Sequence, residues 1–386
     1  MSRAVGSIES KVLKIDEEYL ADKRGRIRQA GTVDPDGHTP DKLRYICEKS
    51  LYWLCVLVLG RHYLTSTLHR PVCNWLSKIP TYRKMLLLPR RHAKTSIVSH
   101  GLPLHILIQP EGGLYLPWKL GADSRILMAG ETADRSRGNL RTVRAVMENN
   151  DLFRGLWPHL VWDNPRKQGA TWNDHELTIP RTEDYPDPSI RAIGVGGAIT
   201  GARHDVHIKD DLVTEEAANS VVVMEGAIDW NTNSRALMDD PNRSLEYIIG
   251  TRWAVKDLYS HVMETDPTMS SLVRSIVEDG QCIYPEVFDL AIVDRLKVEF
   301  GAMFALLYMN NIGDPDLIDF PEEGLRKFAL RDGVCYFTDD VRDLSMVEEQ
   351  VELTLAELFP VGTKLDADAQ VNMADRLREQ FFRLRG

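Results

Sequence analysis

The sequence predicts an α/β fold in which a mostly parallel sheet is flanked by helices. Between about residues 85 and 253, short apolar segments bounded by Gly, Pro or charged residues alternate with longer segments of helical periodicity. Strands that alternate with helices pair in parallel through right-handed crossovers. Three of the apolar segments end in polar residues, and in a parallel sheet such ends share one edge, where ligands bind.

The composition fits a cytoplasmic globular protein. The 386 residues are 43% hydrophobic and 27% charged, which is enough for a substantial core. Five cysteines are scattered without a C-x-x-C pair, as is typical of a reducing compartment. The N-terminus lacks an apolar signal segment, and the longest apolar run, residues 51–59, is too short to span a bilayer. We therefore expect no membrane partner.

Charge is distributed unevenly along the chain. A net charge of −10 argues against a protein that coats nucleic acid through its total charge, although a local basic site remains compatible with it. Residues 339–386 hold 11 acidic and 6 basic side chains, so this tail carries −5, half of the net charge.

The individual elements follow from local patterns. Asp41 is expected to cap a helix that runs through residues 51–59, and Thr132 is expected to cap another. Gly101 and Pro103 are expected to interrupt the helix that begins at Lys94. The expected helices cover residues 41–59, 66–77, 94–108, 132–150, 215–240 and the region after about 285. The expected strands cover residues 85–88, 125–130, 206–211 and 245–253, with a hairpin of 175–180 and 189–195.

The stretch PRRHAKTS at residues 89–96 is a candidate phosphate-binding loop. The usual pattern, G-x-x-x-x-G-K-[ST], has Leu88 and Ala93 at its two glycine positions here. A helix that starts after the loop would offer N–H groups and its dipole to phosphate, with Lys94 on the β- and γ-phosphates and Thr95 on magnesium. A solvated basic turn is the alternative. The candidate nucleotide-binding residues are Pro89, Arg90, Arg91, His92, Ala93, Lys94, Thr95 and Ser96.

The strand predicted at 206–211 ends in a pair of carboxylates. Asp210 is the candidate ligand for Mg²⁺, because hard cations prefer oxygen ligands. Asp211 is the candidate that polarises the attacking water, although glutamate is the usual residue in that role. Glu215 and Glu216 are rival candidates, and a simple turn or helix cap is the alternative.

Thr251 and Arg252 follow the apolar part of the last predicted strand. They are candidates for contacting the γ-phosphate and relaying its loss, and a surface arginine at a strand end is the alternative. The three segments lie at strand ends in the order expected of a nucleotide-hydrolysing enzyme. Together they predict an ATPase with ATP and Mg²⁺ as cofactors.

These segments resemble the large terminase subunits of tailed bacteriophages, the motors that package DNA. That family tolerates a deviant phosphate loop with an arginine four residues before the lysine, as Arg90 stands before Lys94. The resemblance covers roughly residues 45–330 and is most specific over 194–262. The segments that carry it are GRHYLTSTLHRPVCNWL (60–76), GVGGAITGARHDVHIKDDLVTEEAANS (194–220), IIGTRWAVKDLYSHV (248–262) and FGAMFALLYMNN (300–311).

The resemblance implies a P-loop NTPase fold of the additional-strand class. Residues 45–280 would form the ATPase core, preceded by an N-terminal arm at 1–44 and followed by a small helical lid or linker subdomain at 281–338. Large terminases usually carry a second, ribonuclease-H-type nuclease domain, which needs converging carboxylates from distant positions. Too few residues follow the motor domain for such a fold, so we expect no nuclease domain and an acidic helical tail at 339–386.

The resemblance also implies an arginine finger that stabilises charge on the transferring phosphoryl group. Arg137 and Arg141 share a face of one predicted helix and are catalytic candidates, as is Arg90. A solvated helix face is the alternative. Tyr63 and His69 are candidates for contacting the adenine, although His69 equally fits a packed core histidine. Further finger candidates are Arg135, Arg144, Arg203 and Arg252.

The implied function is ATP hydrolysis coupled to moving double-stranded viral DNA into a procapsid in the host cell cytoplasm. The implied partners are double-stranded DNA, the portal of the procapsid, a small terminase subunit, a separate nuclease, and other copies of the chain in a ring that is pentameric by family resemblance. Two alternatives stay open. One is another DNA translocase or helicase. The other is a non-catalytic docking subunit, which Leu88, Ala93 and Asp211 keep open because they depart from the usual motifs.

Overall fold

The computed structural model describes residues 40–165, 167–168, 171–197 and 201–311, together with three short strands nearer the C-terminus. The chain divides into two compact units, Met1–Leu317 and Ile318–Gly386. Apart from residues 40–44, the predicted N-terminal arm lies outside the described residues.

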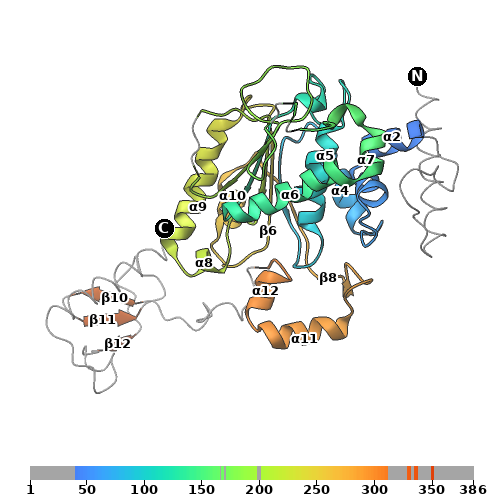
Figure 1. The fold of residues 1–386 in the computed structure, drawn as a ribbon. Coiled ribbons are helices and arrows are strands. Elements are labelled where there is room, and N and C mark those ends of the chain that lie inside the picture. The colour runs from blue at the N-terminus through green and yellow to red at the C-terminus, as the bar shows by residue number, and fades with distance from the viewer. Residues whose placement is uncertain are drawn as a thin grey trace. The chain divides into compact units, whose positions relative to one another are not determined.

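The first unit is built around a seven-stranded sheet with the order β3-β4-β2-β5-β6-β1-β7 (Figure 1). Every neighbouring pair is parallel except β3–β4, which is antiparallel. The predicted fold class and the predicted hairpin are therefore confirmed. The strands are β1 (Arg83–Leu87), β2 (Ile126–Gly130), β3 (Glu176–Leu177), β4 (Ile190–Gly194), β5 (Val206–Asp210), β6 (Leu245–Gly250) and β7 (Ser270–Val273).

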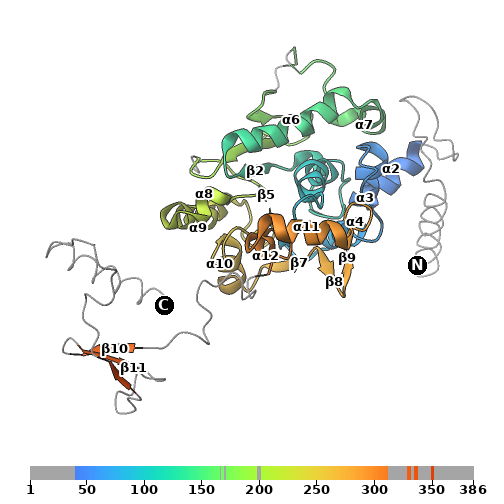
Figure 2. The same ribbon diagram turned by 90° about the horizontal axis from the view of Figure 1, so that it is seen from below.

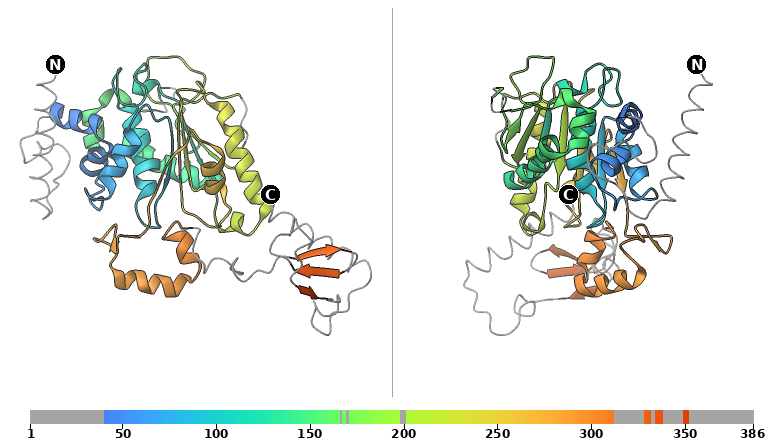
Figure 3. Two further views of the ribbon diagram at one scale, coloured as in Figure 1. Left: turned by 180° about the vertical axis from the view of Figure 1, so that it is seen from behind. Right: turned by 45° about the vertical axis from the view of Figure 1, so that its right-hand side comes forward.

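The two faces of the sheet pack against different helices because side chains alternate along each strand. Leu86 and Leu88 belong to the larger apolar cluster, together with residues of the N-terminal helices and of α6. Met85 and Leu87 belong to a second cluster with residues of α9 and α10. Figure 2 shows α9 and α10 on one side of the sheet and α3 and α4 on the other, and Figure 3 shows the same layers from two further sides.

The helices begin and end close to the predicted positions. Thr132 caps α6, since its side chain accepts a hydrogen bond from the N–H of Arg135. Among the described residues no helix is long and apolar enough to cross a membrane. The helices are α2 (Pro40–Lys49), α3 (Leu51–Trp53), α4 (His69–Ser77), α5 (Leu102–Leu107), α6 (Ala133–Asn149), α7 (Asp151–Leu156), α8 (Glu215–Ala218), α9 (Val221–Ser234), α10 (Leu258–Thr265), α11 (Leu290–Phe300) and α12 (Met303–Leu307).

The first predicted helix is divided, and its predicted cap is wrong. The helix α2 already includes Pro40, so Asp41 lies in its first turn. Ser50 follows the last residue of α2. Its side chain accepts a hydrogen bond from the N–H of Trp53, so Ser50 is the N-cap of α3. A π-helical segment, Leu54–Val58, then carries the chain through the apolar run. A serine in the middle of the pattern therefore acts as an N-cap.

The predicted interruption at Gly101 and Pro103 is also wrong. A π-helical segment, Ser96–Gly101, runs directly into α5, and Pro103 lies in the first turn of α5, where proline costs no hydrogen bond. Gly101 is needed for packing, because a Cβ atom there would lie 2.4 Å from the sulfur of Cys55. The two residues that usually break a helix are thus accommodated here by a wider helical turn and a close contact.

Two further differences concern the second half of the unit. The helix predicted at 215–240 is divided into α8 and α9, because the Ser220 side chain accepts a hydrogen bond from the N–H of Val223 and caps α9. The edge strand β7 and the hairpin of β8 (Val277–Glu278) and β9 (Gln281–Cys282) were not predicted from the sequence. These strands are short and partly exposed, so they lack the apolar runs that marked the central strands.

The helices α11 and α12 form a small third core at the carboxyl end of the sheet. Phe288, Val293, Phe304 and Leu307 pack together there with Leu68. The N–H of Arg90, directly after β1, donates to the carbonyl of Leu307 at 3.2 Å. The phosphate-loop segment is therefore in contact with these helices, which lie below the sheet in Figure 1.

The second unit contains a three-stranded antiparallel sheet of β10 (Phe328–Arg331), β11 (Val334–Phe337) and β12 (Glu349–Val351). The strand β12 lies where the sequence predicted a helix, and that prediction is wrong at these three residues. The apolar residues from Val351 alternate with others as V-E-L-T-L, a period of two that suits a strand. The remainder of the predicted acidic helical tail lies outside the described residues.

Candidate functional site

The candidate site lies at the carboxyl ends of four neighbouring strands. The sheet register aligns the last residues of β2, β5 and β6, because Gly130 pairs with Asp210 and Asp210 with Ile249. Leu87, at the end of β1, pairs with Gly250 in the same way. The residues that follow each strand are therefore held side by side along one edge.

The loop after β1 has the backbone of an anion-binding turn. Arg91 and Ala93 adopt φ angles of 64° and 60°, in the left-handed region that non-glycine residues seldom enter. Ala93 occupies the second glycine position of the usual motif, so alanine takes the conformation that the motif assigns to glycine, at a cost of roughly 1–2 kcal/mol. Left-handed residues alternating with right-handed ones turn successive N–H groups toward one point, which favours an anion.

The helix that follows the loop leaves further donors available. The N–H of Ile97 donates to the carbonyl of Ala93 at 3.1 Å, the first hydrogen bond of this helix. The N–H groups of Lys94, Thr95 and Ser96 therefore have no acceptor within the helix. Such N–H groups, together with the helix dipole, attract phosphate.

Lys94 connects the loop to the neighbouring strands. Its side chain is largely buried, and its Nζ donates to the Thr251 hydroxyl at 2.5 Å. The same Nζ lies 3.5 Å from Oδ1 of Asp211. Lys94, Asp211 and Thr251 come from three different strand ends, and the fold brings these three sequence-predicted residues together.

Asp210 is enclosed by donors from two helices. Its carboxylate accepts hydrogen bonds from the hydroxyl of Ser99 at 2.5 Å, from the amide of Asn139 at 3.3 Å and from the hydroxyl of Thr95 at 3.4 Å. Burial, and after it the charge of Asp211, raises the pKa of Asp210 to about 6. The predicted metal ligands Thr95 and Asp210 are thus in contact, whereas Ser99 and Asn139 were not predicted.

The donor set suits magnesium better than a metal held by protein alone. Among the described residues there is no group of three His, Cys, Asp or Glu side chains that could hold an ion. Mg²⁺ is commonly bound by one or two protein oxygens, with water and substrate phosphates completing its shell. The oxygens of Thr95 and Asp210 fit that description.

Glu131 also belongs to this edge, although it was not among the predicted residues. It follows β2 directly, and its N–H donates to the carbonyl of Asp211 at 3.2 Å. Its carboxylate accepts a short hydrogen bond from the hydroxyl of Thr214. The rule that drew attention to Asp211, a carboxylate just after a buried strand, applies equally to Glu131 and would have identified it.

Arg252 points its side chain into the loop before α10. It is buried, and its guanidinium donates to both carboxylate oxygens of Asp257, at 3.0 and 3.2 Å, and to the carbonyl of Val255. Asp257 is the N-cap of α10. Arg252 also donates to the hydroxyl of Ser260 in the first turn of α10, so unlike Thr251 it bonds its own loop and α10 rather than Lys94 or Asp211.

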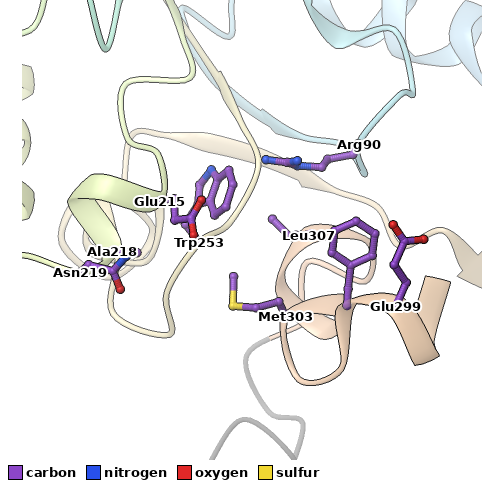
Figure 4. Close-up of a pocket in the computed structure, with 9 residues that line it drawn as sticks. Arg90, Glu215, Ala218, Asn219, Trp253, Glu299, Met303 and Leu307 are labelled. Carbon is purple, nitrogen blue, oxygen red and sulfur yellow. The ribbon is translucent and has the colours of Figure 1, made fainter.

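Arg90 and Glu215 line a separate cavity of about 340 Å³ between the core and α11–α12 (Figure 4). The Arg90 guanidinium lies 4.4 Å from the centre of the Trp253 ring, a cation–π contact. Glu215 stands beside Trp253 in the same cavity. The other lining residues are Ala218, Asn219, Glu299, Phe300, Met303 and Leu307.

The two histidines of the candidate regions are packed core residues. His92 stacks on Phe288 with 5.0 Å between ring centres, and burial lowers its pKa to about 4. His69 contacts the Tyr284 ring edge-on and accepts a hydrogen bond from the N–H of Thr65 at 2.8 Å. Burial lowers its pKa to about 4 as well, so both rings are neutral at pH 7. Tyr63, by contrast, is partly exposed and donates to the Ser96 hydroxyl at 2.8 Å, next to the loop.

The candidate arginine fingers of α6 form ion pairs within the chain. Arg137 lies 3.2 Å from Asp134, and Arg141 lies 3.7 Å from Asp174. The Arg141 side chain is 53% exposed, so its pair is readily exchanged for another partner. The remaining pairs on this helix are Arg135–Glu131 at 3.8 Å and Arg144–Glu148 at 3.6 Å.

The fold is similar to that of phage large terminases in solved structures. The ATPase domain of the Thermus phage P74-26 large terminase is 16% identical, with a TM-score of 0.38, and the match covers 61% of this chain and 90% of that domain. A variant of the same domain is 14% identical at a TM-score of 0.41, with 65% and 96% covered. The large terminase of bacteriophage HK97 is 15% identical at a TM-score of 0.41, with 74% and 52% covered.

These structures come from the family that the sequence resembles. At such identities and TM-scores the likeness assigns no residue role and no activity to this chain. No protein-family profile matches the sequence, and no curated protein matches it.

Proposed function

We propose that this chain is a magnesium-dependent ATPase that moves double-stranded DNA into a procapsid, as the large subunit of a packaging terminase. The observation that carries the ATPase part is the convergence of Lys94, Thr95, Asp210 and Thr251 on one sheet edge, beside a loop with left-handed residues at 91 and 93. The DNA-packaging part rests on the resemblance of the sequence to large terminases.

Each residue of the site has a distinct role in the proposed reaction. The loop N–H groups and Lys94 bind the phosphates, and they are present in the required geometry before nucleotide arrives. Thr95 and Asp210 hold Mg²⁺, which supplies charge neutralisation on the phosphate oxygens. Thr251 exchanges its hydrogen bond with Lys94 for one with the γ-phosphate. Lys94 leaves Thr251 and Asp211 when it binds phosphate, so nucleotide binding changes the contacts of three strand ends at once.

Coupling to DNA then uses two elements that border the site. The phosphate loop contacts α12 through the bond from Arg90 to Leu307, and Arg90 packs on Trp253. A change in the loop is therefore transmitted to α11–α12. In a ring of copies, Arg141 or Arg137 of one copy would reach the γ-phosphate of the next. DNA contacts would be made mainly to phosphates.

The direct test is steady-state ATP hydrolysis by the wild type and by Lys94→Ala, with and without duplex DNA. We expect Lys94→Ala to reduce turnover by about 100-fold or more, because the variant lacks the cation that is proposed to contact the β- and γ-phosphates. Lys78→Ala is the matched control, since Lys78 is an exposed lysine just before the opposite end of β1. It should leave turnover unchanged.

Two other outcomes would favour the alternative functions, and a third would contradict the assignment of the loop. Nucleotide binding without turnover under any condition, including with procapsid and small subunit, would support the docking subunit. Turnover stimulated by single strands together with strand separation would support a helicase. Equal turnover in wild type and Lys94→Ala would remove Lys94 from the site and contradict the assignment of the loop.

A further inference from the structure

We propose that Glu131, and not Asp211, is the general base that takes the proton of the attacking water. This inference rests on the ATP hydrolysis proposed above and deepens it. It concerns the end of β2, which is next to the Asp210–Asp211 pair. The sequence resemblance suggested no role for that strand end.

The position of Glu131 is set by the backbone. The strands β2 and β5 are neighbours, and Gly130 and Asp210 are paired residues at their ends. One residue further on, the N–H of Glu131 donates to the carbonyl of Asp211 at 3.2 Å. Glu131 is therefore one strand removed from the Asp210 carboxylate, on the side away from β6 and the phosphate loop.

Asp210 at the end of β5 and Asp211 directly after it both contact side chains of the segment that follows β1. Asp210 receives hydrogen bonds from three side chains and is the candidate metal ligand. Asp211 has a φ angle of 48°, and its Oδ1 lies 3.5 Å from Lys94. Asp211 is also one methylene shorter than the glutamate that usually fills its role.

Glu131 has one oxygen fixed and the other available. Oε1 accepts the hydrogen bond from the Thr214 hydroxyl. The cation nearest to Oε2 is Arg135 at 3.8 Å, and the Arg135 side chain is 54% exposed. Such an exposed contact is weak and readily exchanged for water. The Glu131 side chain itself is 23% exposed, so water can reach Oε2.

Thr214 makes this arrangement specific. It lies in the segment that leads from Asp211 to α8, and Glu131 is bound to both ends of that segment, through its N–H at Asp211 and its carboxylate at Thr214. The Glu131 side chain is thus oriented by the segment that directly follows the proposed metal ligand Asp210. We assign Thr214 as a positioning residue for the base.

The chemical step is balanced without any further reactant. The water oxygen forms a bond to the γ-phosphorus while the bond between that phosphorus and the β–γ bridging oxygen breaks. The electron pair of the broken bond leaves with ADP. The proton of the water passes to Oε2 of Glu131, which later returns it to solvent. The products are ADP and inorganic phosphate.

The rival base Glu215 lies in a different place. It lines the cavity with Arg90 and Trp253, beside α12 (Figure 4). Substitution of Glu215 therefore serves as a comparison that removes a nearby carboxylate of the same size without touching the Glu131–Thr214 contact.

The experiment compares Glu131→Gln, Asp211→Asn and Glu215→Gln in the full chain. ATP turnover is measured alongside binding of a fluorescent ATP analogue and the rise in melting temperature on adding ATP and Mg²⁺. Glutamine has the same shape and still accepts from Thr214, so Glu131→Gln should bind nucleotide within about threefold of wild type. Its turnover should fall by about 100-fold or more.

Two further variants distinguish a role of Glu131 as general base from a purely structural role. Glu131→Asp keeps the charge with a shorter reach and should recover part of the turnover that Glu131→Gln loses. Thr214→Val should lower turnover by about tenfold and leave nucleotide affinity unchanged, because only the orientation of the carboxylate is lost.

The result that overturns the inference is a Glu131→Gln variant with turnover within threefold of wild type, while Asp211→Asn or Glu215→Gln is inactive. That result would leave the proposed ATPase function intact, since the wild type would still hydrolyse ATP. A wild type that never hydrolyses ATP would instead refute the proposed function, and the role of Glu131 with it.

Discussion

Asp210→Asn is expected to abolish ATP hydrolysis and at the same time to make the nucleotide-free protein more stable above about pH 6. The carboxylate is buried among Ser99, Thr95 and Asn139 and lies beside a second carboxylate, Asp211. Asparagine keeps one acceptor oxygen but has no charge, so it cannot hold Mg²⁺ in the same way. We expect turnover to fall by roughly 100- to 1,000-fold.

The sign of the stability effect follows from the raised pKa of Asp210. The ordinary value is 3.8, and burial with the Asp211 charge raises it to about 6 in the folded protein. The folded state therefore holds a proton that the unfolded state has lost between about pH 4 and pH 6, and stability falls as pH rises through that range. Above about pH 6 the ionised carboxylate costs up to about 3 kcal/mol, which Asp210→Asn removes.

The measurement is thermal unfolding of wild type and Asp210→Asn from pH 4 to pH 8 without nucleotide or magnesium. The variant should melt higher at pH 8, and the difference should shrink toward pH 4. Asp294→Asn is the matched control, because the Asp294 side chain is 77% exposed on α11. A difference between wild type and Asp210→Asn that stays constant with pH would contradict the raised pKa.

Gly250→Ala is expected to destabilise the protein by more than about 3 kcal/mol. Gly250 ends β6, and a Cβ atom there would lie 1.9 Å from the Tyr259 hydroxyl oxygen and 2.0 Å from its ring carbon Cζ. Tyr259 is a fully buried residue of α10 and packs in the second apolar cluster. The strand and the helix would have to separate, and Thr251, the next residue, would shift away from Lys94.

Chemical denaturation of wild type and variant measures this loss. The control is Gly226→Ala in α9, where a Cβ atom meets nothing within 4 Å. Alanine favours the helix there, so this control should gain up to about 1 kcal/mol. The double variant Gly250→Ala/Tyr259→Ala should cost less than the sum of the two single changes, because the clash is then absent. Equal stability of wild type and Gly250→Ala would show that the contact relaxes without cost.

Much of the sheet was predictable because its central strands are buried on both faces. Such strands appear in the sequence as short apolar runs, and MLLL, RILMAG and VHIKDD each became a strand within two residues of the predicted bounds. The strand predicted at 245–253 begins as predicted and ends three residues earlier, at Gly250. The edge strand β7 was missed, since only every second residue of Ser270–Val273 is partly buried. The meeting of Lys94, Asp211 and Thr251 at one edge was likewise predictable, because parallel strands end on the same side.

Other features depended on contacts that only the folded chain makes. Nothing in the sequence shows that Ala93 takes the left-handed conformation of the missing glycine, because that conformation is imposed by the surrounding loop and helix. The sequence placed Arg252 beside Thr251, but successive residues of an extended segment point to opposite sides, and the Arg252 side chain bonds Asp257 instead. The role proposed for Glu131 needs the neighbouring strand and Thr214, which lies 83 residues away along the chain. Local pattern therefore decided the strands and their polar ends, whereas side-chain direction and long-range pairing decided which of those polar groups form the site.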